Sequence, residues 1–92
     1  MTNYKAVYKY PITGLLGSTI QLPKDAKILC VKEQFDEIFL WALVDTTAEL
    51  EDRQIIMVET GKSIVPKNAH YIDTILTVRG AYVLHCFELL TE

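Results

Sequence analysis

The side chains that could do chemistry in this chain of 92 residues are few and scattered. The histidines, cysteines and serines are His70, His85, Cys30, Cys86, Ser18 and Ser63. None has the short spacing of a zinc site, and adjacent strand residues such as His85 and Cys86 point to opposite faces. No serine lies in a G-x-S-x-G elbow, and cysteines in apolar runs stay protonated. We therefore predict no catalytic residues, no metal, no cofactor and no enzyme activity.

Anion binding is the chemistry that one segment does suggest. The segment Glu59-Thr60-Gly61-Lys62-Ser63 places hydroxyl groups on both sides of a glycine and adds one lysine. Backbone N–H groups in such a turn can form an anion-binding nest, and Lys62 adds a positive charge. An ordinary tight turn is the simpler interpretation. The functional one is an anion contact through Thr60, Gly61 and Lys62.

Aromatic and arginine side chains complete the predicted ligand-binding set. An arginine can grip a phosphate through two hydrogen bonds, and a flat ring can stack on a base. Most of the rings are expected to pack in the core. The residues that we predict to contact a ligand are Trp41, Arg53, Thr60, Gly61, Lys62, Tyr71 and Arg79.

Composition narrows the class of protein. Half of the residues are hydrophobic and the formal net charge is −3, which predicts one folded domain over residues 1–92. The nine lysines and arginines are spread along the chain, so binding to duplex nucleic acid is not expected. The chain has no apolar run of membrane-spanning length and no signal peptide, which predicts a cytoplasmic protein with no membrane partner. Cys30 and Cys86 could face each other in the core, but a disulfide is not expected in that compartment.

The elements that must position these residues are strands. Alternating or wholly apolar segments bounded by glycine, proline or polar turns predict strands at 4–10, 18–22, 26–34, 38–44, 53–60, 71–78 and 81–90. This pattern is typical of an all-β fold, either a small sandwich or a barrel of about seven strands. One helical turn over 47–51, capped by Thr47, is also expected.

The apolar segment Phe39–Val44 is predicted to be the central strand around which the other strands are arranged. It contains the only tryptophan, and its side chains are apolar on both faces, which predicts a central strand. The last strand is predicted to be central for the same reason, and the first is predicted to be an edge strand because its outward face carries lysines. A small domain cannot cover so much apolar surface by itself, so we predict a homo-oligomer.

Several segments of the chain resemble a family of small uncharacterised proteins encoded by bacteriophages and prophages. The resemblance lies in YKYP at 8–11, LPKDAKIL at 22–29, LWALVD at 40–45, TGK at 60–62, YIDT at 71–74 and HCFE at 85–88. In that family the position of Glu59 is commonly a glycine and that of Lys62 often a histidine, so this turn departs from the pattern.

The resemblance implies a role in countering host antiviral defence in the host cytoplasm. Such small phage proteins act by binding, either by sequestering a cyclic nucleotide signal or by capping a host defence protein. The alternative is a structural or assembly component of the virion.

Overall fold

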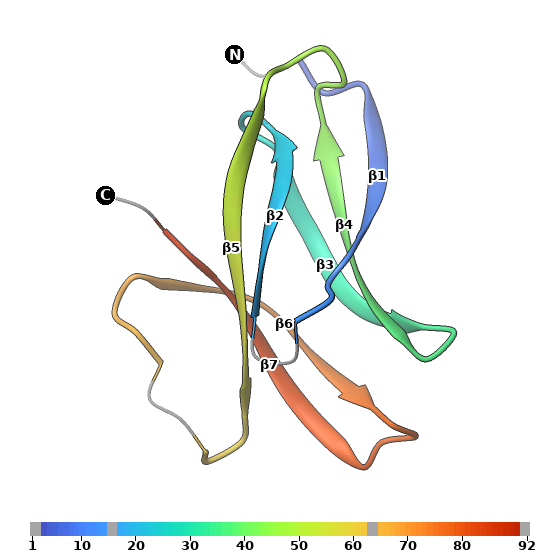
Figure 1. The fold of residues 1–92 in the computed structure, drawn as a ribbon, viewed down its shortest axis with the longest axis vertical. Coiled ribbons are helices and arrows are strands. Elements are labelled where there is room, and N and C mark those ends of the chain that lie inside the picture. Colours follow the sequence, from blue (N-terminus) through green and yellow to red (C-terminus); the bar gives the residue numbers. More distant parts are fainter. Residues whose placement is uncertain (1–2, 15–16, 63–64, 91–92) are drawn as a thin grey trace.

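The computed structural model describes residues 3–14, 17–62 and 65–90 of the chain, and in that part it consists of antiparallel strands (Figure 1). The strands are β1 (Ala6–Pro11), β2 (Gly17–Pro23), β3 (Lys27–Gln34), β4 (Glu37–Val44), β5 (Leu50–Glu59), β6 (Ala69–Thr77) and β7 (Tyr82–Leu89). The predicted all-β class and the seven strands are thereby confirmed. The two sheets pack face to face as a sandwich and do not close into a barrel.

The strands divide unevenly between the two layers. Sheet A has three strands in the order β1-β4-β3, and sheet B has four in the order β2-β5-β7-β6. The chain crosses between the layers after β1, after β2 and after β4, so that sheet B combines β2 with the three consecutive strands β5, β6 and β7. As predicted, β4 and β7 lie in the interior of their sheets and β1 lies at an edge.

The core lies between the inner faces of the two sheets. Leu40, Ala42 and Val44 of β4 are completely buried and contribute the inner face of sheet A together with Val31. Sheet B opposes them with buried residues of β2, β5, β6 and β7, which include Leu22, Ile55, Met57, Ile75 and Cys86. Alternation along β4 therefore points Phe39, Trp41 and Leu43 to the outer face of sheet A, where each is half-buried.

Proline is the last residue of two edge strands, Pro11 in β1 of sheet A and Pro23 in β2 of sheet B. The Ile12 N–H donates to the Ile38 carbonyl, and the Lys24 N–H donates to the Glu49 carbonyl. Residues alternate in an antiparallel ladder, so the nitrogens of Pro11 and Pro23 face away from the neighbouring strand. Proline lacks a donor there without breaking the ladder, which is why it is tolerated at these edges.

Carboxylates join the sheets along the other edge, where β3 lies beside β6. Asp73 Oδ2 accepts a hydrogen bond of 3.2 Å from the Val31 backbone N–H at the free edge of β3. Glu33 Oε1 accepts hydrogen bonds from the Thr77 hydroxyl and from the Val78 N–H. These contacts satisfy edge donors that would otherwise be open to another strand.

The turns agree with the sequence except at one place. The chain reverses at Glu59–Lys62 and at Val78–Ala81, as predicted, and Gly61 and Gly80 take positive φ angles of 75° and 84°. The predicted helical turn over 47–51 is wrong. Asp45 Oδ1 instead accepts hydrogen bonds from the backbone N–H and the hydroxyl of Thr47, so a carboxylate-capped turn leads directly into β5.

Candidate functional site

A chain of hydrogen bonds on the outer face of sheet B is the most organised polar group on the surface of the described residues. His85 Nε2 lies 2.7 Å from Thr60 Oγ1, and His85 Nδ1 lies 3.0 Å from Thr74 Oγ1. The Thr74 hydroxyl lies 2.8 Å from the Tyr71 hydroxyl. We call Thr60, Tyr71, Thr74 and His85 the His85 cluster.

The position of each member follows from the ladder of sheet B. His85 lies on the interior strand β7, opposite Thr74 on β6 and opposite Val58 on β5. Thr60 begins the turn that follows β5, which places its hydroxyl beside the imidazole. A register shift between Tyr71 and Asp73 in β6 lies next to the cluster. Three of the short motifs that were singled out in the sequence, 60–62, 71–74 and 85–88, therefore meet at this one place.

The imidazole of His85 is held at both nitrogens by neutral hydroxyl groups. A neutral imidazole donates from one nitrogen and accepts at the other, so the two threonines must take opposite roles toward it. Each hydroxyl can both donate and accept, so the chain from Thr60 to Tyr71 can be polarised in either direction. The cluster can thus present either a donor or an acceptor at its exposed ends, Thr60 and Tyr71.

An aromatic pair lies beside the cluster. The rings of Tyr71 and Phe87 meet edge to face, with centroids 5.7 Å apart and planes at 71°. Tyr71 is 55% exposed, so part of its ring is open to a ligand while Phe87 fixes its orientation. The site therefore combines an accessible ring with hydroxyl and imidazole groups.

The turn after β5 extends this site. The Lys62 N–H donates to the Glu59 carbonyl at 3.1 Å, so this donor is used within the turn and does not face a bound anion. Gly61 has no heavy atom within 4 Å of the position that a Cβ would take, so its role is the positive φ of the turn. The Lys62 side chain is exposed beside Thr60 and is the cation nearest in sequence to the cluster.

The structure places the other predicted ligand residues elsewhere. Thr60 and Tyr71 come together at the His85 cluster and Gly61 and Lys62 lie in the turn that follows Thr60, but Trp41 lies on the outer face of sheet A. Arg79 lies at the tip of the hairpin between β6 and β7, with a φ of 57°. Trp41 and Tyr71 therefore cannot contact one small ligand within a single copy of the chain.

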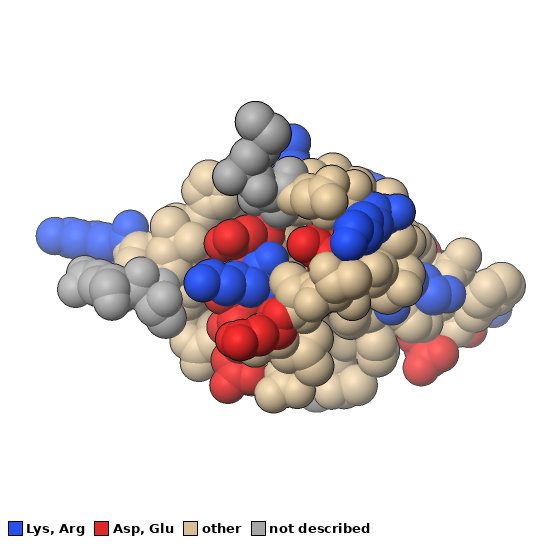
Figure 2. Space-filling view, turned by 90° about the horizontal axis from the view of Figure 1, so that it is seen from above, with Lys and Arg blue, Asp and Glu red and all other residues tan. Residues whose placement is uncertain are grey.

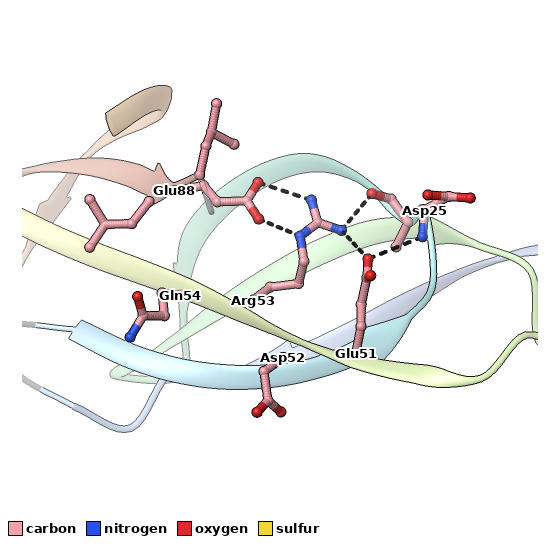
Figure 3. A pocket seen from close by; sticks show the side chains of 9 residues that line it. Asp25, Glu51, Asp52, Arg53, Gln54 and Glu88 are labelled. Carbon is pink, nitrogen blue, oxygen red and sulfur yellow. Dashed lines mark hydrogen bonds and ion pairs between the residues drawn. The ribbon is translucent and has the colours of Figure 1, made fainter. Parts of the chain in front are cut away.

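Arg53 points into one end of the sandwich (Figure 3). Its guanidinium donates to both carboxylate oxygens of Glu88, and Nη1 donates to the Ala26 carbonyl at 2.9 Å. Glu51 Oε2 lies 3.7 Å from the same Nη1. The pocket of about 300 Å³ around Arg53 is lined by four carboxylates, Asp25, Glu51, Asp52 and Glu88.

Charge at this end of the molecule works against an incoming phosphate. Figure 2 shows acidic side chains gathered around a basic one in the middle of the end that carries the turns after β2 and β4. The donors of Arg53 are engaged by Glu88 and by the backbone, and the surrounding carboxylates repel an anion. Arg53 therefore serves the packing of the two sheets in this arrangement.

Burial and hydrogen bonding shift the pKa values of two groups, Asp73 and Cys86. Burial alone would raise the pKa of the Asp73 carboxyl, but hydrogen bonds from Lys32, Val31 and Thr74 outweigh it and lower the pKa. Burial in the core raises the pKa of the Cys86 thiol to about 11. Cys86 is therefore a protonated core residue at neutral pH, and Cys30 and Cys86 are free thiols in different layers.

The residues that organise both sites were not predicted from the sequence. His85, Thr74 and Glu88 are absent from the predicted ligand-binding set. The available signal was the set of short motifs that were singled out in the sequence, because Thr60, Thr74, His85 and Glu88 all lie within them. No cluster of three metal-ligating side chains occurs in the described part of the chain. Within the same residues, no helix is long and apolar enough to cross a bilayer.

Comparison with known proteins gives a family for this chain. A family model described as a domain of unknown function, DUF7352, matches residues 3–92. Searches of curated proteins and of solved structures found no match.

Proposed function

This chain belongs to the DUF7352 family, and we propose that it is a non-enzymatic binding protein that holds a nucleotide ligand at the His85 cluster. The observation that carries the proposal is the position of His85 between the Thr60 and Thr74 hydroxyls, with the Tyr71 phenol at the end of the same chain. Hydroxyl and imidazole groups suit the sugar and phosphate oxygens of a nucleotide. The exposed ring of Tyr71 offers a surface on which a base can stack.

Binding without turnover is favoured by the surroundings of His85. A general base is usually oriented by a carboxylate and placed beside a nucleophile, as in a catalytic triad. His85 contacts neutral hydroxyls at both nitrogens, and the nearest cysteine, Cys86, is buried with a raised pKa. These features support recognition of a ligand more than acid–base chemistry.

The biological role that we propose comes from the resemblance to phage proteins. In this role the protein acts in the host cytoplasm and counters antiviral defence by sequestering a cyclic nucleotide signal. Sequestration needs a rigid scaffold and a selective site, and the seven-stranded sandwich supplies the scaffold. Capping of a host defence protein is the second form of the same role, and a structural or assembly part of the virion is the alternative.

A thermal-shift screen against cyclic mono- and dinucleotides tests the proposal. A ligand at a hundred times its dissociation constant stabilises the folded state by about 2.7 kcal/mol, which raises Tm by several degrees in a domain of this size. We expect such a shift for at least one cyclic nucleotide. If no nucleotide in the panel shifted Tm, nucleotide binding would be excluded, and capping of a host protein or a virion role would remain.

Two threonine variants locate the site once a ligand is found. Thr74→Val keeps the side-chain volume but removes the hydroxyl that joins His85 to Tyr71, so the shift should fall sharply. Thr19→Val makes the same change on the exposed face of β2 and should leave the shift intact. Equal shifts in the two variants would place the ligand elsewhere on the molecule.

A further inference from the structure

The outer face of sheet A carries an apolar row that no other element of the described chain covers. Phe39, Trp41 and Leu43 form the row along the interior strand β4, and each is half-buried. Val7 on β1 and Leu29 on β3 extend it on the two sides and are 53% and 44% exposed. This face belongs to the layer opposite the His85 cluster.

Lysines from the two neighbouring strands border this row. Lys9 lies opposite Trp41 in the ladder between β1 and β4, while Lys27 and Lys32 of β3 lie opposite Leu43 and Phe39. All three therefore project from the same face as the tryptophan. They are far apart in the sequence, and the sheet brings them together around the only tryptophan of the protein.

The charge of this face is positive although the whole chain is acidic. Lys32 forms an ion pair of 3.1 Å with Asp73 at the edge of the sheet. Lys9 Nζ donates instead to the neutral Gln34 Oε1 at 2.9 Å, and within residues 3–14, 17–62 and 65–90 neither Lys9 nor Lys27 has a carboxylate partner. The carboxylates of β4 and its following turn, Glu37 and Asp45, lie at the two ends of the row.

We propose that the outer face of sheet A binds single-stranded nucleic acid. A strand of nucleic acid needs both an aromatic platform for its bases and cations along its backbone, and this face supplies both. In a symmetric pairing of this face with a second copy, the lysines of the two copies would repel each other, which argues against such a dimer. A duplex would hide its bases from Trp41, so the ligand is single-stranded.

The arrangement of the rings assigns their roles. Phe39 and Trp41 lie edge to face with centroids 6.1 Å apart. The Lys9 ammonium lies 4.4 Å from the centroid of Phe39, which covers that ring and holds the cation in place. Trp41 is therefore the ring that stacks on a base, and Lys9 and Lys27 contact the flanking phosphates.

Titration of the purified protein with a thymidine oligonucleotide of about 12 nucleotides tests the proposal, because Trp41 is the only tryptophan. Stacking should quench its fluorescence. With about two phosphate contacts, the affinity should fall roughly 7-fold when the salt concentration rises from about 50 to about 200 mM. A matched uridine oligonucleotide shows whether DNA or RNA is preferred. The proposal is wrong if neither oligonucleotide quenches Trp41.

Variants and ligand controls separate stacking from charge. Measured with a fluorescein-labelled oligonucleotide, Trp41→Leu should weaken binding roughly tenfold, and Lys9→Gln with Lys27→Gln should reduce the salt dependence. An oligonucleotide with abasic sites should bind more weakly than the thymidine strand. Equal binding of the abasic strand, or of polyglutamate, would show a charge effect only and overturn the stacking proposal.

The same measurements keep this inference distinct from the proposed nucleotide site. Thr74→Val alters the His85 cluster on the other sheet and should leave oligonucleotide binding unchanged, while Trp41→Leu should leave any cyclic nucleotide shift unchanged. If Thr74→Val abolished oligonucleotide binding, the strand would lie on sheet B and this inference would fail. Circular dichroism confirms that each variant is folded.

Discussion

The guanidinium of Arg53 engages both carboxylate oxygens of Glu88 inside the end of the sandwich, where Arg53 also reaches the Ala26 carbonyl at the start of sheet A (Figure 3). Glu88 is only 7% exposed, so the pair is largely removed from water. Burial of charge is tolerated here because each group has the other as its partner. The ion pair therefore links β5 and β7 of sheet B to the chain that enters β3.

Removing one member of this pair should be costly. We expect Arg53→Met to destabilise the fold by about 3 kcal/mol, because Glu88 is left buried without a partner. The double variant Arg53→Met with Glu88→Gln removes both charges and should recover a large part of that loss. Urea denaturation of the unaltered protein, Arg53→Met, Glu88→Gln and the double variant measures both effects. If Arg53→Met alone were neutral, the pair would be solvated in solution.

Acid should weaken the contact between β3 and β6. The pKa of Asp73 lies below its ordinary value of 3.8 in the folded protein, so its ionised form stabilises the fold above that pH. This contribution is lost as the pH falls below about 4. We expect Asp73→Asn to cost about 1–2 kcal/mol at neutral pH and to show a shallower loss of stability in acid. Denaturation at several pH values checks this, and parallel acid profiles for both proteins would contradict it.

Phe35 is expected to weaken the fold at the tip of the hairpin between β3 and β4. Phe35 and Asp36 have φ angles of 53° and 64°, which asparagine and glycine accept more easily than phenylalanine does. The Phe35 side chain is 86% exposed, so its removal uncovers nothing. Phe35→Asn should therefore stabilise the protein by about 1 kcal/mol. A destabilised variant would show that Phe35 packs against something in solution, such as a second copy.

The predicted homo-oligomer should be sought on sheet B. Leu76 near the end of the hairpin between β6 and β7 is 62% exposed, and its pairing with Val83 puts it on the same outer face of sheet B as His85. We expect light scattering at micromolar concentration to give a multiple of the 10.5 kDa chain mass. Leu76→Lys should shift the protein toward the monomer, since an interface seldom accepts an unpaired charge. A monomeric mass for the unaltered protein would contradict the prediction.

Local features of the sequence were enough to predict the strands. Alternating or wholly apolar segments, bounded by turn residues, placed all seven strands close to their observed bounds. Gly61 and Gly80 indicated two of the turns, because glycine adopts a positive φ angle more easily than other residues do. Apolar residues on both faces correctly predicted β4 and β7 to be interior strands, although only the inner face of β4 is covered by the opposite sheet. The error at Thr47 is also local, because Asp45 accepts hydrogen bonds from the backbone N–H and the hydroxyl of Thr47, so that this hydroxyl does not cap a helical turn.

Other properties depend on contacts between distant parts of the chain. Periodicity does not say which strands share a sheet, so the sequence predicted Trp41 and Tyr71 as parts of one site, while the sandwich puts them on different layers. It also did not show that Arg53 would be paired with Glu88, 35 residues away. The sequence by itself determined where the strands and turns lie, because these depend on neighbouring residues. Only the tertiary structure decided that Thr60, Thr74 and His85 meet and that Lys9 and Lys27 border Trp41, because strand pairing brings together residues that local patterns cannot relate.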